Sequence, residues 1–168
     1  MKNNEFYGCS QPLEDVDLDA CEAVLKHKLP SEFRQHYLKY NGGVPENSLI
    51  PGNDEWEPFE IAGFYPIRHR RSAAGSQSSL LIEHYQLMCA KDVIPDHLLP
   101  FAYDPGGNFF CLHLCDGSAH FYATDGFDPA RSVAENFVKA QRRLAGSFKI
   151  FMDSLMHNSE YDSDEWPE

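Results

Sequence analysis

The sequence predicts a globular domain in which helices cover a sheet of hairpin-connected strands. Apolar residues recur at helical spacing in residues 16–40 and again in residues 132–155. Between these regions, apolar runs of strand length flank two short turns rich in aspartate and glycine, at residues 104–107 and 116–117. Strands joined by such short turns pair in an antiparallel arrangement.

Size and charge narrow the class of protein. A chain of 168 residues and 19.1 kDa can bury a self-sufficient core as one domain. Its 26 acidic and 14 basic residues give a formal net charge of -12. This charge repels phosphate backbones and attracts basic surfaces. We therefore expect a basic protein as partner, and no nucleic acid.

The sequence also lacks several signals of location and chemistry. Its first residues contain no apolar run of a signal peptide, and no segment approaches the roughly 20 apolar residues of a membrane span. The five cysteines are an odd number without a C-x-x-C pair, which indicates neither a disulfide framework nor a zinc knuckle. We expect a cytoplasmic protein with reduced thiols, no cofactor and no membrane partner.

Two helices are expected to open the fold. The first covers residues 16–27. The second begins near Pro30, places Phe33 and Tyr37 on one face and ends at the left-handed stop Asn41-Gly42-Gly43. The histidine of this second helix, like the other helical histidines, is expected to be solvated on a polar face.

Short elements and loops are expected in the middle of the chain. Residues 44–58 are rich in Pro, Gly, Asn and acidic residues, which predicts a surface loop, and residues 59–67 predict a short strand. A basic, serine-rich stretch at 68–79 is expected to be a flexible excursion before a third helix near residues 81–88.

The segment FAYDPGGNFFCLHL (residues 101–114) contains glycines that could bind phosphate or form a turn. Asp104, Pro105, Gly106 and Gly107 lie between two apolar runs and fit a type II turn, with Pro second and Gly third. A phosphate-binding loop would be followed by a helix whose N-terminus binds the anion, and Asp104 would repel that anion. We therefore expect a structural turn.

The second turn predicts a register for the next two strands. If Asp116-Gly117 is a two-residue loop, His113 lies opposite His120 and Cys111 opposite Tyr122 on one face of the sheet. The opposite face is expected to be the core.

Cys111, His113 and His120 are weak candidates for metal ligands on that first face. Neighbours on a flat sheet rarely converge on one tetrahedral point without a further ligand from a loop. We therefore expect no metal, a half-exposed histidine pair and a Cys111 that packs as a small apolar residue.

The C-terminal region is expected to be helical from 132 to about 155, with an interruption near Gly146, and to cover the sheet. Residues 158–168 contain acidic but no basic side chains, which predicts a solvated tail. We expect one domain over residues 1–157 and a flexible acidic tail over 158–168.

Four blocks of the sequence together resemble the SUKH superfamily, the Smi/Knr-type domains of many bacterial immunity proteins and of a fungal cell-wall-synthesis regulator. These blocks are LPSEFRQHYLKYNGGVPE (29–46), IPDHLLPFAYDPGGNFFCLHL (94–114), DGSAHFYATD (116–125) and SFKIFMDSL (147–155). The resemblance implies an α+β fold with a mostly antiparallel sheet flanked by helices. In bacteria it implies a cytosolic antidote that binds a toxin, often a nuclease. It transfers no catalytic motif.

Both tryptophans follow an Asp-Glu pair, which suits a protein interface. Exposed aromatic side chains supply contact energy, and carboxylates steer a basic partner. We expect partner contacts in the loop at Asp54, Glu55, Trp56 and Glu57, and in the tail at Asp162, Asp164, Glu165 and Trp166. Alternatively, Trp56 packs inward.

The function expected from these features is that of an immunity protein, which neutralises a secreted or contact-delivered toxin by occluding its active site. We expect no enzymatic activity, because no spacing motif places a nucleophile beside a base. The chain is expected to be a monomer or weak dimer. The alternative is a regulatory scaffold of the fungal type, which binds cellular proteins.

Overall fold

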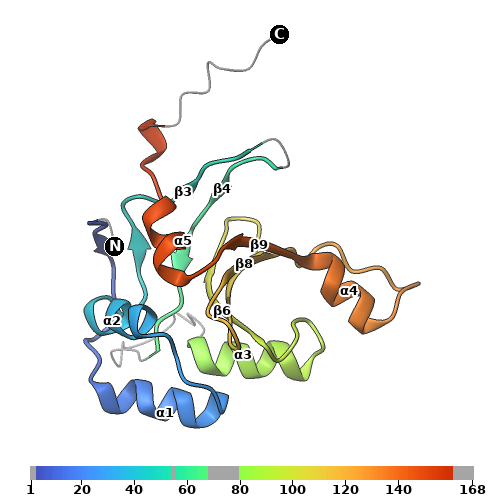
Figure 1. Ribbon diagram of the computed structural model, residues 1–168, viewed down its shortest axis with the longest axis horizontal. Coiled ribbons are helices and arrows are strands. Elements are labelled where there is room, and N and C mark those ends of the chain that lie inside the picture. Colours follow the sequence, from blue (N-terminus) through green and yellow to red (C-terminus); the bar gives the residue numbers. More distant parts are fainter. Residues whose placement is uncertain (1–2, 54–55, 68–79, 161–168) are drawn as a thin grey trace, which may run out of the picture.

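The computed structural model describes residues 3–53, 56–67 and 80–160 of the chain (Figure 1). Its elements are β1 (Phe6–Tyr7), α1 (Asp15–Leu25), α2 (Ser31–Lys39), β2 (Val44–Pro45), β3 (Leu49–Ile50), β4 (Phe59–Glu60), β5 (Gly63–Phe64), α3 (Leu81–Ala90), β6 (Leu98–Tyr103), β7 (Phe109–His113), β8 (Ala119–Tyr122), α4 (Val133–Ala140), β9 (Gln141–Ala145), α5 (Phe148–Ser154) and the 3-10 turn η1 (Asn158–Glu160).

The central sheet has five antiparallel strands in the order β5-β6-β7-β8-β9. Two antiparallel ribbons, β1-β2 and β3-β4, accompany it. Figure 1 shows α1 and α2 at one end of the view and α4 at the other, with α3 beside the sheet. The expected α+β fold, a mostly antiparallel sheet flanked by helices, is confirmed.

One face of the sheet carries the larger core, which is rich in aromatic rings. Phe33 of α2 and Phe148 of α5 lie with ring centroids 4.9 Å apart, and Phe148 lies 5.3 Å from Phe101 of β6. The hydroxyl of Tyr37 donates to the carbonyls of Tyr65 and Phe101, at 3.0 and 3.3 Å. This buried hydroxyl therefore ties α2 to the sheet without leaving a polar group unpaired.

The other face carries a smaller core, because side chains alternate along each strand. Its buried members are Ile94, Leu98, Phe109, Cys111 and Tyr122. Partly buried side chains of α3 and α4 pack against them. The two helices therefore cover this face only in part, which leaves room for surface features.

Some of the elements differ from the sequence-based expectation. The loop expected at 44–58 contains β2 and β3, and the strand expected at 59–67 is split into β4 and β5, which pair with different partners. The helical region expected from 132 to 155 is interrupted by β9, which pairs with β8. Pairing with an existing sheet edge outweighs helix propensity here. The stretch 68–79 lies outside the described residues.

The turn at Asp104–Gly107 also differs in type. A type II turn needs a left-handed conformation at its third residue, but Gly107, the fourth residue, has a φ of 85° and Gly106 is not left-handed. Asp104 accepts hydrogen bonds from the backbone and side-chain nitrogens of Asn108, both at 2.8 Å. The loop is therefore a three-residue hairpin connection closed by a left-handed glycine.

The hairpin between β7 and β8 has a longer loop than expected, so the predicted register is wrong by two residues. His113 N donates to Ser118 O at 2.9 Å, and Gly117 N donates to His113 O at 2.8 Å. Asp116 accepts from Ser118 N at 2.9 Å, which stabilises a four-residue loop. Cys111, and not His113, therefore lies opposite His120. A shift by two keeps each side chain on its face.

Candidate functional site

The acidic loop predicted as a contact site is the end of the β3-β4 ribbon. Asn53 N donates to Trp56 O at 2.9 Å, while Asp54 and Glu55 lie outside the described residues. Trp56 is half-buried, with the guanidinium of Arg142 5.2 Å from its ring centroid, and Glu57 is exposed. Trp56 therefore contacts a side chain of β9, and its role in partner binding stays a prediction.

The other predicted contacts lie in the tail, at Asp162, Asp164, Glu165 and Trp166, outside the described residues. The chain remains attached to the fold just before that segment. Ser48 Oγ donates to Asn158 Oδ1 at 3.3 Å, and Asn158 Nδ2 donates to Glu60 Oε1 at 3.3 Å. The boundary after residue 157 stays a prediction.

The three weak metal candidates do not form one cluster. Cys111 is fully buried in the smaller core, where burial strongly raises the pKa of its thiol. The rings of His113 and His120 lie 5.5 Å apart, as diagonal neighbours and not directly opposite each other. Within residues 3–53, 56–67 and 80–160, no three His, Cys, Asp or Glu side chains are placed to hold a metal ion.

A third histidine extends this pair into a row, a feature that was not predicted. The ring of His97 lies 5.0 Å from that of His113, because Leu114 N donates to His97 O at 2.8 Å beside the sheet. Burial and the neighbouring His113 lower the pKa of His120. The hairpin of β7 and β8 brings His113 and His120 together, but only the pairing of β6 with β7 adds His97, so no local pattern could indicate the third member of the row.

Ser118 joins the row to a carboxylate but does not form a catalytic triad. Its Oγ lies 2.9 Å from His120 Nε2 and 2.5 Å from Asp116 Oδ1. In a triad the carboxylate orients the histidine, and the hydroxyl is accessible to substrate. Here the carboxylate binds the hydroxyl itself, and Ser118 is fully buried. The arrangement therefore holds the hairpin loop and presents no nucleophile.

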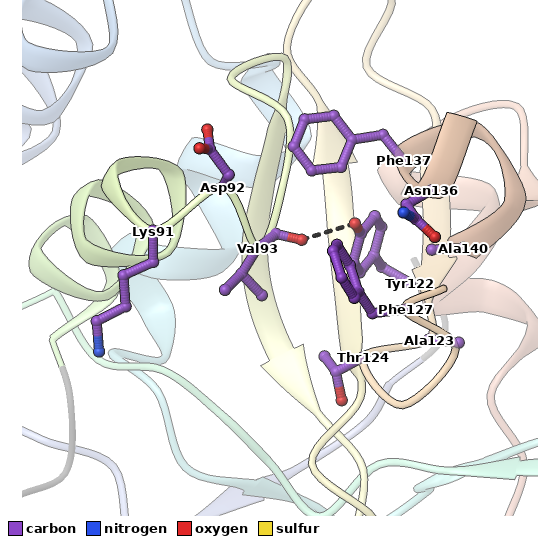
Figure 2. A pocket seen from close by; sticks show the side chains of 10 residues that line it. All are labelled: Lys91, Asp92, Val93, Tyr122, Ala123, Thr124, Phe127, Asn136, Phe137 and Ala140. Carbon is purple, nitrogen blue, oxygen red and sulfur yellow. Dashed lines mark hydrogen bonds between the residues drawn. The ribbon is translucent and has the colours of Figure 1, made fainter. Parts of the chain in front are cut away.

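A pocket of about 170 Å³ lies on the same side of the sheet, between the α3-β6 connection and α4. Its walls are largely apolar: Val93, Tyr122, Phe127, Phe137 and Ala140 (Figure 2). Lys91, Asp92, Thr124 and Asn136 supply the polar lining. The walls come from three separate segments of the chain, so sequence reasoning did not find this pocket.

Hydrogen bonds fix the floor and one wall of the pocket. The hydroxyl of Tyr122 donates to the Val93 carbonyl at 2.6 Å (Figure 2). Burial raises the pKa of Tyr122 to about 12, so the hydroxyl keeps its proton at neutral pH. Asn136, itself buried, donates to Asp128 O at 2.9 Å and accepts from Asp128 N at 2.8 Å. The loop before α4 is therefore held against the helix.

The start of α4 is defined by a capping box. Ser132 Oγ accepts from Glu135 N at 3.2 Å, and Glu135 Oε2 accepts from Ser132 N at 2.8 Å. These bonds satisfy backbone donors that a helix start otherwise leaves unpaired. The helix that carries Phe137 and Ala140 into the pocket thus begins at a defined residue.

The size of the pocket indicates what it can bind. Sites for small molecules usually enclose about 300–1,000 Å³, and this pocket is smaller. It has room for about one large side chain. With its apolar walls, it resembles the anchor pockets in which protein interfaces concentrate their binding energy.

The family is shown by direct comparison. The model of the SMI1/KNR4 family (SUKH-1) matches residues 12–154, most of the chain. The chain belongs to this family. The family consists of protein-binding modules, and the resemblance inferred from the four sequence blocks is confirmed. A comparison with curated proteins found no match. Among the described helices, none is long and apolar enough to cross a membrane.

Proposed function

We propose that the protein is a cytoplasmic immunity protein, which binds a cognate bacterial toxin and occludes its active site. The formal net charge of -12 on a member of a protein-binding family carries this proposal. A nuclease toxin must present cationic groups to nucleic acid phosphates. An acidic protein can cover that surface and associate rapidly through electrostatic steering.

The exposed carboxylates suit this role better than a catalytic one. Glu57 on the β3-β4 ribbon is exposed, and with Asp54 and Glu55 beside it in sequence it can steer a basic partner. The described polar cluster closest to a catalytic triad, around Ser118, is closed to substrate. These observations support binding without catalysis.

Co-expression with the product of the adjacent upstream gene tests the proposal. We expect the chain to rescue cell growth and to purify with that product as a one-to-one complex. A core variant, Phe101→Ala, serves as the control that should lose rescue because the fold is destabilised. If the neighbour is harmless, or is toxic and not neutralised, the immunity role is wrong and a regulatory scaffold becomes the better hypothesis.

Salt dependence tests the electrostatic part separately. The association rate should fall at least about tenfold when salt is raised from roughly 50 mM to roughly 300 mM, because ions screen charges beyond the Debye length. A tight complex whose association rate does not change with salt would show that apolar contacts, and not steering, determine recognition.

A further inference from the structure

The segment that forms one side of the pocket exposes unusually large apolar side chains. Phe127 is 61% exposed, and Val138 of α4 is 75% exposed. A single exposed apolar side chain needs no explanation. Phe127, however, borders a concave site whose other walls, including Val93 and Phe137, are also apolar.

The pocket is formed before any partner binds. Tyr122 is held by the Val93 carbonyl, and the loop before α4 is held by Asn136. Interfaces gain affinity when the anchor site needs little ordering on binding. The walls are therefore ready to accept one apolar side chain.

A carboxylate, that of Asp92, lies on the rim of the pocket (Figure 2). Asp92 follows the end of α3 with a φ of 53°, in the left-handed region where glycine is the usual residue. Aspartate and asparagine are among the few other residues that adopt this conformation as single residues. Lys91, the other charged residue of the lining, extends away from the rings of Tyr122 and Phe127 in Figure 2. Asp92 directly precedes the wall residue Val93, so the charged residue next to this apolar wall in the chain is negative.

We propose that this pocket anchors a partner protein through one apolar side chain of Leu, Met or Phe size, with a Lys or Arg next to it that pairs with Asp92. The proposal deepens the proposed function and rests on its claim that the partner is a basic protein. The pocket's volume selects one side chain, and the chain's net charge of -12 selects a basic segment around it.

A random peptide library displayed on phage and selected on the full chain tests this without knowledge of the partner. We expect enriched peptides that place an apolar residue beside Lys or Arg. Three variants then locate the binding site: Ala140→Met fills the pocket, Phe127→Ala removes an exposed wall, and Asp92→Asn removes the charge but tolerates the left-handed backbone.

The expected effects differ among the variants. Ala140→Met and Phe127→Ala should each weaken peptide binding by about tenfold or more, as loss of an anchor does. Asp92→Asn should weaken it by about threefold to tenfold, and less at high salt. Val138→Ala is the matched control on the same helix and should change nothing. Thermal unfolding of each variant verifies its fold, and Phe127→Ala remains informative if Ala140→Met does not fold.

Several results would overturn the proposal. Peptides that bind Ala140→Met and Phe127→Ala as tightly as the unmodified chain would place recognition elsewhere. A consensus without a basic residue would remove the role of Asp92. Self-association of the chain that Ala140→Met abolishes would make a second copy the occupant. Neutralisation in the co-expression experiment, together with peptides that avoid the pocket, would remove this site and leave the immunity function intact.

Discussion

The two faces of the central sheet bear different kinds of surface. The face under α1, α2 and α5 is closed by a continuous aromatic core, in which Phe33, Phe101 and Phe148 are almost completely buried. The face under α3 and α4 has a smaller core, a pocket and a half-buried histidine row. The closed face can therefore supply stability, whereas the open face carries the pocket for which we propose a partner side chain.

The polar groups on the two sides have different partners. On the closed side, Arg34 contacts carboxylates of Asp15, Asp19 and Glu22 at 2.9, 3.0 and 3.1 Å, so α2 is tied to α1. On the open side, His113 Nδ1 lies 3.3 Å from Asp116 Oδ1, and His120 Nδ1 is buried without a hydrogen-bond partner. Unsatisfied polar atoms cost stability. Among the described residues each side carries such an atom, His120 Nδ1 on the open side and His36 Nε2 on the closed side, so the difference between the sides lies in the ion pairs of Arg34.

The largest expected effect compares two phenylalanines, one from each side. Phe101→Ala should lower the free energy of unfolding by about 3–5 kcal/mol, because it opens a cavity in a closed aromatic core. Phe127→Ala should change that free energy by no more than about 0.5 kcal/mol, because the side chain is mostly exposed. Urea denaturation measures both. Similar losses for the two variants would refute the division between the faces.

A smaller effect is expected from the ion network of the closed side. Glu22 accepts from Leu29 N at 3.0 Å and pairs with Lys28 and Arg34. Burial alone would raise the pKa of Glu22, but these partners lower it overall. Glu22→Gln should cost about 2 kcal/mol, since it leaves charged donors without their carboxylate. Glu83→Gln, on the exposed surface of α3, is the control.

Urea denaturation of Glu22→Gln and Glu83→Gln measures whether the ion network contributes more to stability than an exposed carboxylate does. If Glu83→Gln costs as much as Glu22→Gln, the network contributes no more than an exposed carboxylate. Glu22→Gln should also flatten the loss of stability in acid. A carboxylate with a lowered folded-state pKa stabilises the fold above its unfolded pKa, and this contribution disappears as the pH falls.

Local chemistry made a large part of the fold predictable from the sequence. The helical periodicity of residues 31–39 predicts α2, but the helix ends in an extended residue, Tyr40, before the left-handed Gly42 and Gly43 are reached. The hairpin strands follow from apolar runs around turns. The register between β7 and β8 could not be predicted in the same way. The Asp-Gly pair favours a two-residue loop, but Asp116 accepts a hydrogen bond from Ser118 and stabilises a longer one.

The candidate site could not be predicted to the same extent. The pocket combines the end of α3 with β8 and α4, and β9, which continues directly from α4, was expected to be helical. Its strand conformation depends on pairing with β8, a contact that local propensity does not contain. The acidic loop was identified by composition, but the packing of Trp56 against Arg142 needed the fold.

The burial of His36, on the closed side, also could not be predicted from the local sequence. The sequence places this histidine on a polar helix face, but in the structure it is only 3% exposed. Phe6 of β1 and Phe148 of α5 lie within 4.8 and 5.4 Å of its ring centroid, and both come from distant parts of the chain. Its Nε2 has no hydrogen-bond partner. Burial, with a smaller contribution from Lys39, lowers the pKa of His36 to about 3.

This burial predicts a pH dependence that belongs to the closed face. The unfolded chain binds a proton at His36 near pH 6.5, whereas the folded chain keeps the ring neutral down to about pH 3. The unfolded state therefore binds more protons between these values, and stability falls as the pH falls. From about pH 7.5 to about pH 5.5 the loss attributable to His36 should be about 1.4 kcal/mol.

His36→Leu removes the titrating group while it preserves an apolar side chain in the aromatic cluster. Urea denaturation of both proteins at the two pH values isolates the contribution of His36, since all other histidines are present in both. The unmodified chain should lose about 1.4 kcal/mol more than the variant. Equal losses would mean that the ring of His36 is protonated within the fold, so that α2 opens to water and the closed face is less closed than its packing indicates.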